Sequence, residues 1–285
     1  MALWEEPLDV RAIRHIFRAW PVPRGKGVLL RVFSPLLRNR SFSFETAKGV
    51  MVPADLGDWI TLHGFVEGYD GEFGPSWSLI RSGSTVIDVG ANIGIWTIGA
   101  AKRTGPSGKV HAFEPLKSNF SRLLSNIELN RVSNVLPQNV ALSDRAGTLR
   151  FFPSPNKNSG VGLLKPEGWD VPTCGVEAIT LDGYCEQRQI GSVAVLKIDV
   201  EGAELLVLKG ATRLLSSPSP PSIVFEMNRN MAANFDSSPE KVGALLGKFN
   251  YSVFTYRAGS WHPVELAEFY GHEDLLARHI SADLH

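Results

Sequence analysis

The sequence predicts an α/β protein with a doubly wound, mostly parallel sheet, preceded by an extension of helix and strand. Apolar runs at 86–89 and 110–113 are separated by a helical pattern near 93–103, and this alternation implies parallel strands joined by a right-handed crossover. A turn containing two glycines follows the first run directly. The chain has 285 residues, 44% of them hydrophobic, which suffices for one sizeable α/β core plus an appendage.

Residues 1–75 are predicted to form the extension, and residues 76–285 the main domain. An amphipathic helix is expected from Leu8 to Trp20, before Pro21. Its apolar positions are Ile13, Ile16, Phe17 and Trp20, and the opposite positions are Arg11, Arg14 and Arg18. Short alternating runs across 42–66, with a turn at Lys48-Gly49, predict a small strand region. We interpret the extension as a lid or as a dimerisation element of a homodimer.

The main domain continues with further alternating elements. A helix is predicted at 118–129, then strands at 135–142, 148–152, 176–181 and 193–198, a helix at 202–215, a strand at 223–225, a helix at 239–249 and a strand at 251–256. The segment Pro153 to Thr173 is rich in Pro, Gly, Ser and Asn, which predicts a mobile loop.

Composition narrows the functional classes. Twenty-nine basic and twenty-nine acidic residues balance, so nothing global favours a nucleic acid partner, although the stretch from Val10 to Arg40 is basic without an acid. Cys174 and Cys185 form no CxxC pair, which gives little support for zinc or a disulfide and predicts free thiols. The first residues are acidic and no apolar run reaches the roughly 18 residues of a membrane span, so we expect a soluble cytoplasmic protein.

The segment Asp88 to Gly94 carries the strongest chemical signal. Gly90 falls where the chain must turn sharply, and Gly94 where the next helix must approach the strand. A dinucleotide fingerprint needs a second and a third glycine where this chain has Asn92 and Ile95, so NAD is disfavoured. Asp88 places negative charge where a sulfonium or an α-amino group would lie, which favours S-adenosylmethionine (SAM). Glu114, about 20 residues beyond Gly94, is placed to accept hydrogen bonds from both ribose hydroxyls.

Seven short motifs then occur in a recognisable order. They are VIDVGANIG, AFEP (112–115), NVALSD (139–144), ITLDGY (179–184), LKIDVEGAE (196–204), VLKGA (207–211) and IVFEMN (223–228). The ordered set resembles the FkbM-type class I methyltransferases across roughly 72–256. The resemblance implies a seven-stranded Rossmann-like sheet, SAM as the methyl donor, and O-methylation of a hydroxyl on a sugar, polyketide or other small metabolite.

Carried over residue by residue, the resemblance assigns the cofactor site. Asp88, Gly90, Asn92 and Gly94 would line the methionine end of SAM, Glu114 would hold the ribose, and Asn139 with Val140 would border the adenine. Glu72 resembles the acidic residue that many family members place near the SAM amino group, with Asp70 as a competitor.

The acceptor side is predicted from residues that end the later strands. Asp199 is the first choice for orienting the acceptor and also borders the cofactor, with Glu226 and His63 behind it as catalytic candidates. Lys197 should lie on the same face of the sheet as Asp199 and could form an ion pair with it. Asp199, Glu226 and Asn228 also resemble the Mg²⁺ ligands of catechol-type O-methyltransferases, although Glu stands where Asp is expected. A metal is therefore not favoured.

The remaining candidates have structural interpretations. Glu204 opens a helix, where negative charge is favoured. His111 is expected in the core. His262, His272, His279 and His285 fall near a terminus that is expected to fray, and they receive no role. The aromatic residues Trp59, Phe65, Tyr69, Phe73 and Trp77 could form an apolar acceptor pocket, but core packing is expected for most of them. Two alternatives stay open: methylation of an RNA or protein, and a non-catalytic SAM-binding partner of a biosynthetic assembly.

Overall fold

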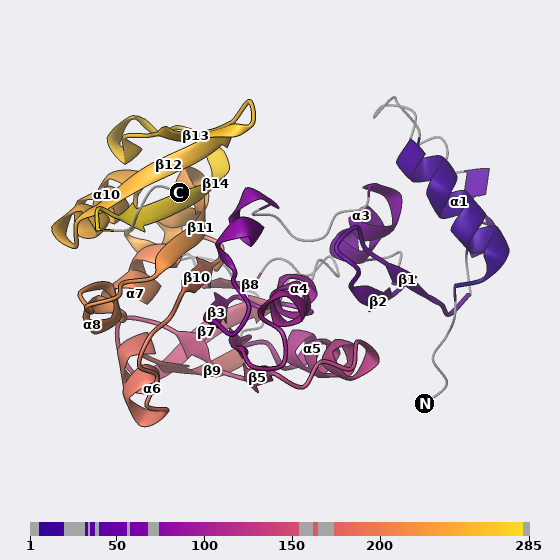
Figure 1. Ribbon diagram of the computed structural model, residues 1–285, viewed down its shortest axis with the longest axis horizontal. Helices are drawn as coiled ribbons and strands as arrows, with labels where there is room; N and C mark the ends of the chain where they lie inside the picture. The colour runs from indigo at the N-terminus through magenta and orange to yellow at the C-terminus, as the bar shows by residue number, and fades with distance from the viewer. Residues whose placement is uncertain are drawn as a thin grey trace.

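The computed structural model describes residues 6–19, 32–33, 35–37, 40–55, 58–67, 74–153, 162–164 and 174–281. Its centre is an eight-stranded sheet whose strand order is β13-β12-β14-β11-β10-β3-β4-β5 (Figure 1). In that order the strands are β13 (Ser260–Pro263), β12 (Tyr251–Arg257), β14 (His272–His279), β11 (Ser222–Asn228), β10 (Val195–Ile198), β3 (Thr85–Val89), β4 (Lys109–Phe113) and β5 (Val135–Gln138).

Six of these strands run in one direction. β5, β4, β3, β10 and β11 pair in parallel, and β12 shares their direction because both β11 and β12 are antiparallel to β14. The predicted seven-stranded, mostly parallel sheet is therefore confirmed, with β13 added at its edge by a hairpin from β12. The carboxyl ends of the six parallel strands lie along one edge of the sheet, where ligands bind in such folds.

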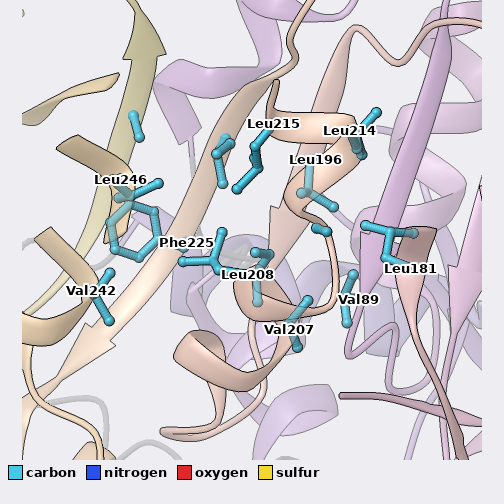
Figure 2. Close-up of a cluster of buried hydrophobic side chains, with 14 of the residues drawn as sticks. Val89, Leu181, Leu196, Val207, Leu208, Leu214, Leu215, Phe225, Val242 and Leu246 are labelled. Atoms are coloured by element: carbon cyan, nitrogen blue, oxygen red, sulfur yellow. The ribbon is translucent and has the colours of Figure 1, made fainter. Parts of the chain in front are cut away.

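Alternate residues of each strand enter two different cores, as the period of two requires. On one face, Ile87, Leu196 and Phe225 pack against the helices α6 (Leu181–Gln187), α7 (Glu204–Lys209), α8 (Thr212–Leu215) and α10 (Pro239–Lys248). Figure 2 shows this cluster, with Leu208, Leu215 and Leu246 directed into it from the helices. On the other face, Val86 and Val195 pack with residues of α4 (Ile95–Thr104) and the 3₁₀-helix η2 (Gly74–Leu79). The sheet is covered on both sides, as predicted.

The predicted helix at 202–215 is interrupted. Gly210 separates α7 from α8, and a Cβ at that position would lie 2.1 Å from the carbonyl oxygen of Ser143. The carboxylate of Asp182 accepts hydrogen bonds from the amides of Arg213 and Leu214, at 2.8 and 3.0 Å, which satisfies the start of α8. The interruption lets the chain pass closely under the neighbouring 141–143 segment.

The predicted strand at 135–142 also divides in two. β5 belongs to the central sheet, whereas β6 (Ala141–Leu142) belongs to a second, four-stranded sheet of order β6-β9-β7-β8. The other members are β7 (Gly147–Pro153), β8 (Gly162–Leu164) and β9 (Cys174–Ile179). β8 lies within the segment that is predicted to be a mobile loop. It forms a strand there because it pairs with the end of β7. Pro153 ends β7, and residues 154–161 and 165–173 of that predicted loop lie outside the described residues.

The N-terminal extension has its own aromatic core. α1 (Leu8–Ala19) and the hairpin of β1 (Ser43–Glu45) and β2 (Met51–Pro53) match the prediction. The last part of the strand region predicted across 42–66 is wrong, because α3 (Trp59–Glu67) is a helix. Asp58 accepts a hydrogen bond from the Thr61 amide at 3.1 Å, in the manner of a helix N-cap. Phe65 then packs edge-on against Phe17 and Phe44.

Two residues of α1, Arg14 and Ile16, differ from the amphipathic prediction. Arg14 is buried rather than exposed, because Glu6 accepts two hydrogen bonds from its guanidinium, each 2.7 Å long. Ile16 is 43% exposed instead of buried. The extension contacts the main domain through α4 and α5 (Lys117–Leu129), where the side-chain amide of Asn130 both donates to and accepts from the backbone of Met51. Trp20 lies outside the described residues.

The largest departure from the sequence prediction is β14. No strand is predicted beyond residue 256, yet β14 lies between β11 and β12 and pairs with both. Its centre, Leu275 to Ala277, is completely or almost completely buried. No helix among the residues described here is long and apolar enough to cross a membrane.

Candidate cofactor and acceptor site

The turn after β3 requires its glycines. Gly90, Asn92 and Gly94 all have positive φ, at 79°, 52° and 89°. A Cβ at Gly90 would lie 1.8 Å from the carbonyl oxygen of Asp199, and one at Gly94 would lie 2.4 Å from Leu123 Cδ1. Asn92 tolerates this conformation better than most residues. The turn therefore adopts the tight geometry that the sequence predicted, and it contacts the segment that follows β10.

Beneath the turn lies a buried charged cluster. Asp88 is completely buried, and its Oδ2 accepts a 2.5 Å hydrogen bond from Thr97. Lys197 lies opposite Asp88 in the register of β3 and β10, and its Nζ is 3.1 Å from Asp88 Oδ1. The same Nζ donates to the Gly90 carbonyl at 3.0 Å and lies 3.3 Å from Asp199 Oδ2. The expected Lys197–Asp199 ion pair is thus present, and Lys197 joins both strands to the turn.

The charge state of this cluster follows from its composition. Burial is the largest single influence on Lys197 and favours the neutral amine, but the Asp88 and Asp199 carboxylates together outweigh it and raise the pKa of Lys197 above its ordinary value. The lysine is therefore charged at neutral pH. Two carboxylates around one ammonium leave a net negative charge at this edge of the sheet, and of the two only the Asp199 side chain is accessible, at 35% exposure.

Glu114 lies directly after β4 and faces the turn. Its Oε2 accepts a hydrogen bond from the Asn92 amide and its Oε1 accepts one from Leu116, both 2.9 Å long. Burial raises the pKa of Glu114 to about 7, and these two amide donors only partly oppose that rise. A carboxylate oxygen retains further acceptor capacity after one hydrogen bond. Glu114 can therefore accept hydroxyl donors from a ligand that lies against the turn.

Asn139 and Val140 lie between β5 and β6, beside the Glu114 segment. The Asn139 side chain donates to the carbonyls of Glu114 and Pro115, at 2.8 and 3.0 Å. Val140 packs, partly buried, against the main core. The structure therefore brings the predicted adenine-side residues next to the predicted ribose-side carboxylate.

The acceptor candidates lie at the neighbouring strand ends. Glu226, near the end of β11, is 8% exposed, and its Oε1 is 2.5 Å from His272 Nε2. Asn228 accepts hydrogen bonds from the amides of Asn230 and Met231 and so caps the short helix α9 (Arg229–Ala232). Among the described residues no group of three or more His, Cys, Asp or Glu side chains is arranged to hold a metal ion.

Sequence reasoning missed two residues here. The sequence assigns His272 no role because it falls near a terminus that is expected to fray, whereas the structure places it at the start of β14, in contact with Glu226. Glu204 is almost completely buried: its Oε1 accepts from the Gly202 amide at 3.0 Å, and its Oε2 is buried without a hydrogen bond. Burial, with contributions from the Glu226 and Asp199 charges, raises the pKa of Glu204 to about 7. The motif GAE contained this residue, but only the fold shows its burial.

Other candidates lie elsewhere. His63 is half-buried on α3 of the extension, on a helix rather than on the strand that was expected. His111 is buried and hydrogen-bonded to the Tyr184 hydroxyl, and burial lowers its pKa to about 4, so its interpretation as a core residue is confirmed. Phe65 and Trp77 are buried core residues, as expected. Glu72, with its competitor Asp70, lies outside the described residues.

The strand order, the antiparallel β14, the glycine turn after β3 and the acidic residue after β4 together define a class I methyltransferase fold. Within that class the chain belongs to the FkbM methyltransferase domain family, whose model matches residues 88–253.

Relatives with described activities agree with this assignment. The chain is 35% identical over 130 residues to the hexuronic acid methyltransferase AglP of Haloferax volcanii, a match that covers 46% of this chain and 51% of the relative. It is 33% identical over 159 residues to the 31-O-demethyl-FK506 methyltransferase FkbM of Streptomyces tacrolimicus, covering 46% and 60%. The chain thus matches only about half of each relative's length.

Solved structures are more distant. Fibrillarin of Aeropyrum pernix, in complex with natively bound S-adenosyl-L-methionine, has 12% sequence identity and a TM-score of 0.41, with coverage of 84% of this chain and 82% of that one. Similarity at this level is too low to transfer any feature of fibrillarin to this chain.

Proposed function

We propose that this chain is a SAM-dependent methyltransferase that methylates a hydroxyl group of a small metabolite, such as a sugar, a polyketide or another natural product. The observation that carries this proposal is Glu114, whose buried carboxylate faces the glycine turn and binds the amide of Asn92. The relatives' names, which specify a hexuronic acid and a demethylated FK506, support a hydroxylated small molecule as acceptor.

The residues present fit SAM. Bound SAM supplies an electrophilic methyl group on a positively charged sulfur. The chain offers positive-φ residues where a ligand approaches the backbone, a net negative charge around Lys197 that suits a cation, and Glu114 as an acceptor for ribose hydroxyls. In this arrangement Asp88 acts from behind the turn, through Lys197 and the Gly90 carbonyl, while Asp199 faces the methionine end.

The acceptor hydroxyl is proposed to lie over the ends of β10 and β11. Asp199, the accessible carboxylate, orients it there, and Glu226 lies on the next strand. His63 is the third catalytic candidate. Methyl transfer to a hydroxyl needs orientation and removal of one proton, which side chains can provide without a metal. We therefore propose a metal-free reaction, and loss of activity on EDTA treatment followed by recovery with Mg²⁺ would instead favour ligation by Asp199, Glu226 and Asn228.

The basic stretch of 10–40 is proposed to serve structure rather than nucleic acid binding. Arg14 is buried against Glu6, Arg18 donates to the carbonyls of Glu45 and Gly64, and Arg40 pairs with Asp9. These intramolecular contacts occupy guanidinium groups that a phosphate backbone would need. We retain residues 1–75 as a proposed lid or homodimer contact, and 76–285 as the proposed catalytic domain.

Calorimetric titration with SAM tests the cofactor site. Glu114→Ala is expected to weaken SAM binding at least about 100-fold, because two hydrogen bonds to a charged acceptor are worth roughly 1.5–3 kcal/mol each. Glu128→Ala, an exposed change on α5, is the matched control and should bind as the wild type does.

Full affinity in Glu114→Ala would contradict the proposed cofactor site. If SAM bound normally but wild type methylated neither glucuronic acid, glucose nor any other hydroxylated compound, the chain would instead be a non-catalytic SAM-binding partner. Methylation of RNA with steep salt dependence would favour a macromolecular acceptor.

A further inference from the structure

A row of ionisable side chains crosses the sheet edge on one face. Asp88 and Lys197 are register partners, and the pairing of β10 with β11 ends at Ile198 and Phe225, one residue before Asp199 and Glu226. On β14, Asp274 is opposite Glu226, and His272 is opposite Asn228. Since side chains alternate between faces along each strand, the row from Asp88 to His272 lies on the same face of the sheet.

His272 extends this row outward. It begins β14, so it lies two residues farther than Asp274 toward the edge where the parallel strands end. Its side chain is 55% exposed, while that of Glu226 is 10% exposed, and the 2.5 Å contact joins His272 Nε2 to Glu226 Oε1. A largely buried carboxylate thus holds one nitrogen of an accessible imidazole, at the edge where the proposed acceptor lies.

We infer that His272 is the general base of the proposed methyl transfer and that Glu226 positions it. This inference rests on the proposed function, and it concerns a residue beyond the 88–253 segment that matches the family model. The arrangement is the one in which a carboxylate fixes the orientation of a histidine and stabilises its protonated form. It also gives Glu226 a task that does not require the carboxylate to touch the acceptor.

The proton balance is simple. The acceptor oxygen forms a bond to the methyl carbon as the bond from that carbon to the sulfonium sulfur breaks, and the sulfur keeps the electron pair. The hydroxyl proton moves to the imidazole nitrogen that does not face Glu226. The products are a methyl ether, S-adenosylhomocysteine and an imidazolium paired with Glu226, which returns its proton to water.

Several charged groups lie around His272 on the neighbouring elements. Glu226 faces it from β11, and Asp199 and Glu204 influence the same region from β10 and α7. On its own strand Glu273 and Asp274 follow, with Glu273 bound by Arg257 and Thr255 of β12. Arg229, which follows Asn228, donates to Glu240 and to the Phe269 carbonyl. Glu226, which lies 2.5 Å from His272 Nε2, is therefore the carboxylate in direct contact with the imidazole.

The first test is kinetic, with glucuronic acid and glucose as acceptor probes. His272→Gln is expected to lower kcat/KM by about 100-fold or more and to abolish the rise of the rate with pH that a neutral imidazole produces, while SAM affinity stays unchanged. Glu226→Gln should move that rise to lower pH by about one unit. His279→Gln changes a histidine at the other end of β14 and is the matched control.

The second test does not depend on turnover. NMR titration of the His272 imidazole should give a pKa in wild type that falls by about one unit in Glu226→Gln, and is unchanged in His279→Gln.

Three outcomes would overturn the inference. An NMR pKa of His272 that is the same in wild type and in Glu226→Gln would show that the two residues do not act as a pair. If His272→Gln turned over at the wild-type rate with an unchanged pH profile, the assignment of His272 as the base would be overturned, but the proposed function would not. If wild type bound SAM but methylated neither these two probes nor any other hydroxylated compound, the proposed function would fail and this inference with it. The wild-type protein alone is enough to detect that outcome.

Discussion

At the proposed cofactor side of the sheet edge, around the turn after β3, backbone conformation dominates. At the proposed acceptor side, near the ends of β10, β11 and β14, side chains from strands distant in sequence come together. Between β3 and β4, positive-φ residues and backbone amides surround one carboxylate, Glu114, and the determinants lie within about 30 residues of sequence. Between β10 and β14, Glu226 and His272 meet across 46 residues. The first side thus suits a constant ligand, and the second can change with the acceptor.

Lys197 joins the two sides, and its removal is expected to have the largest effect. Lys197→Met leaves Asp88 buried without its cation, which should lower the free energy of unfolding by about 3–5 kcal/mol in urea titrations. The double variant Asp88→Asn/Lys197→Met removes both charges and should recover part of that loss. If the free energy of unfolding of Lys197→Met were within about 1 kcal/mol of the wild-type value, contacts other than those of Lys197 would hold the two sides together.

Removal of the Asp199 charge should affect turnover much more than SAM affinity. Asp199→Asn keeps the size of the side chain but removes the accessible charge, so turnover should fall by about 10- to 100-fold while SAM affinity changes only a few-fold. Paired measurement of kcat and of calorimetric affinity checks this. An equal loss in both quantities would place Asp199 wholly on the cofactor side.

The smallest expected effect is a pH dependence confined to the cofactor side. Burial raises the pKa of Glu114 to about 7, and ribose hydroxyls donate to its charged form. SAM affinity should therefore rise with pH through neutrality and fall by about tenfold between one unit above and one unit below pH 7. Glu114→Gln, which cannot ionise, should bind more weakly and with a flat profile, and a wild-type affinity independent of pH would contradict this assignment.

The cofactor side could be predicted from sequence because its causes are local and steric. Gly90 and Gly94 stand where any Cβ would collide with Asp199 or Leu123, so glycine itself signals the geometry. What the sequence could not give is the burial of Asp88. From the sequence, a carboxylate near the end of a buried strand could equally well face a ligand. Only the register of Asp88 with Lys197 shows that Asp88 forms an ion pair inside the protein.

The acceptor side and the extension were harder because tertiary contacts override local pattern. β14 begins with the polar sequence His-Glu-Asp, which hides the short buried run of Leu275 to Ala277. In α3 the β-branched and aromatic residues suggested a strand, yet the Asp58 cap and the packing of Phe65 against Phe17 make it a helix. The Asp58 cap was the signal in the sequence that could have identified this helix.

The position of β14 between β11 and β12 has a consequence for synthesis. The ribosome makes β14 after every other strand described here, so β11 and β12 must wait with unpaired edges until His272 to His279 has emerged. Exposed strand edges of this kind are templates for association with other chains. The nascent chain is thus most prone to association through these edges in the interval before β14 has emerged and paired with β11 and β12.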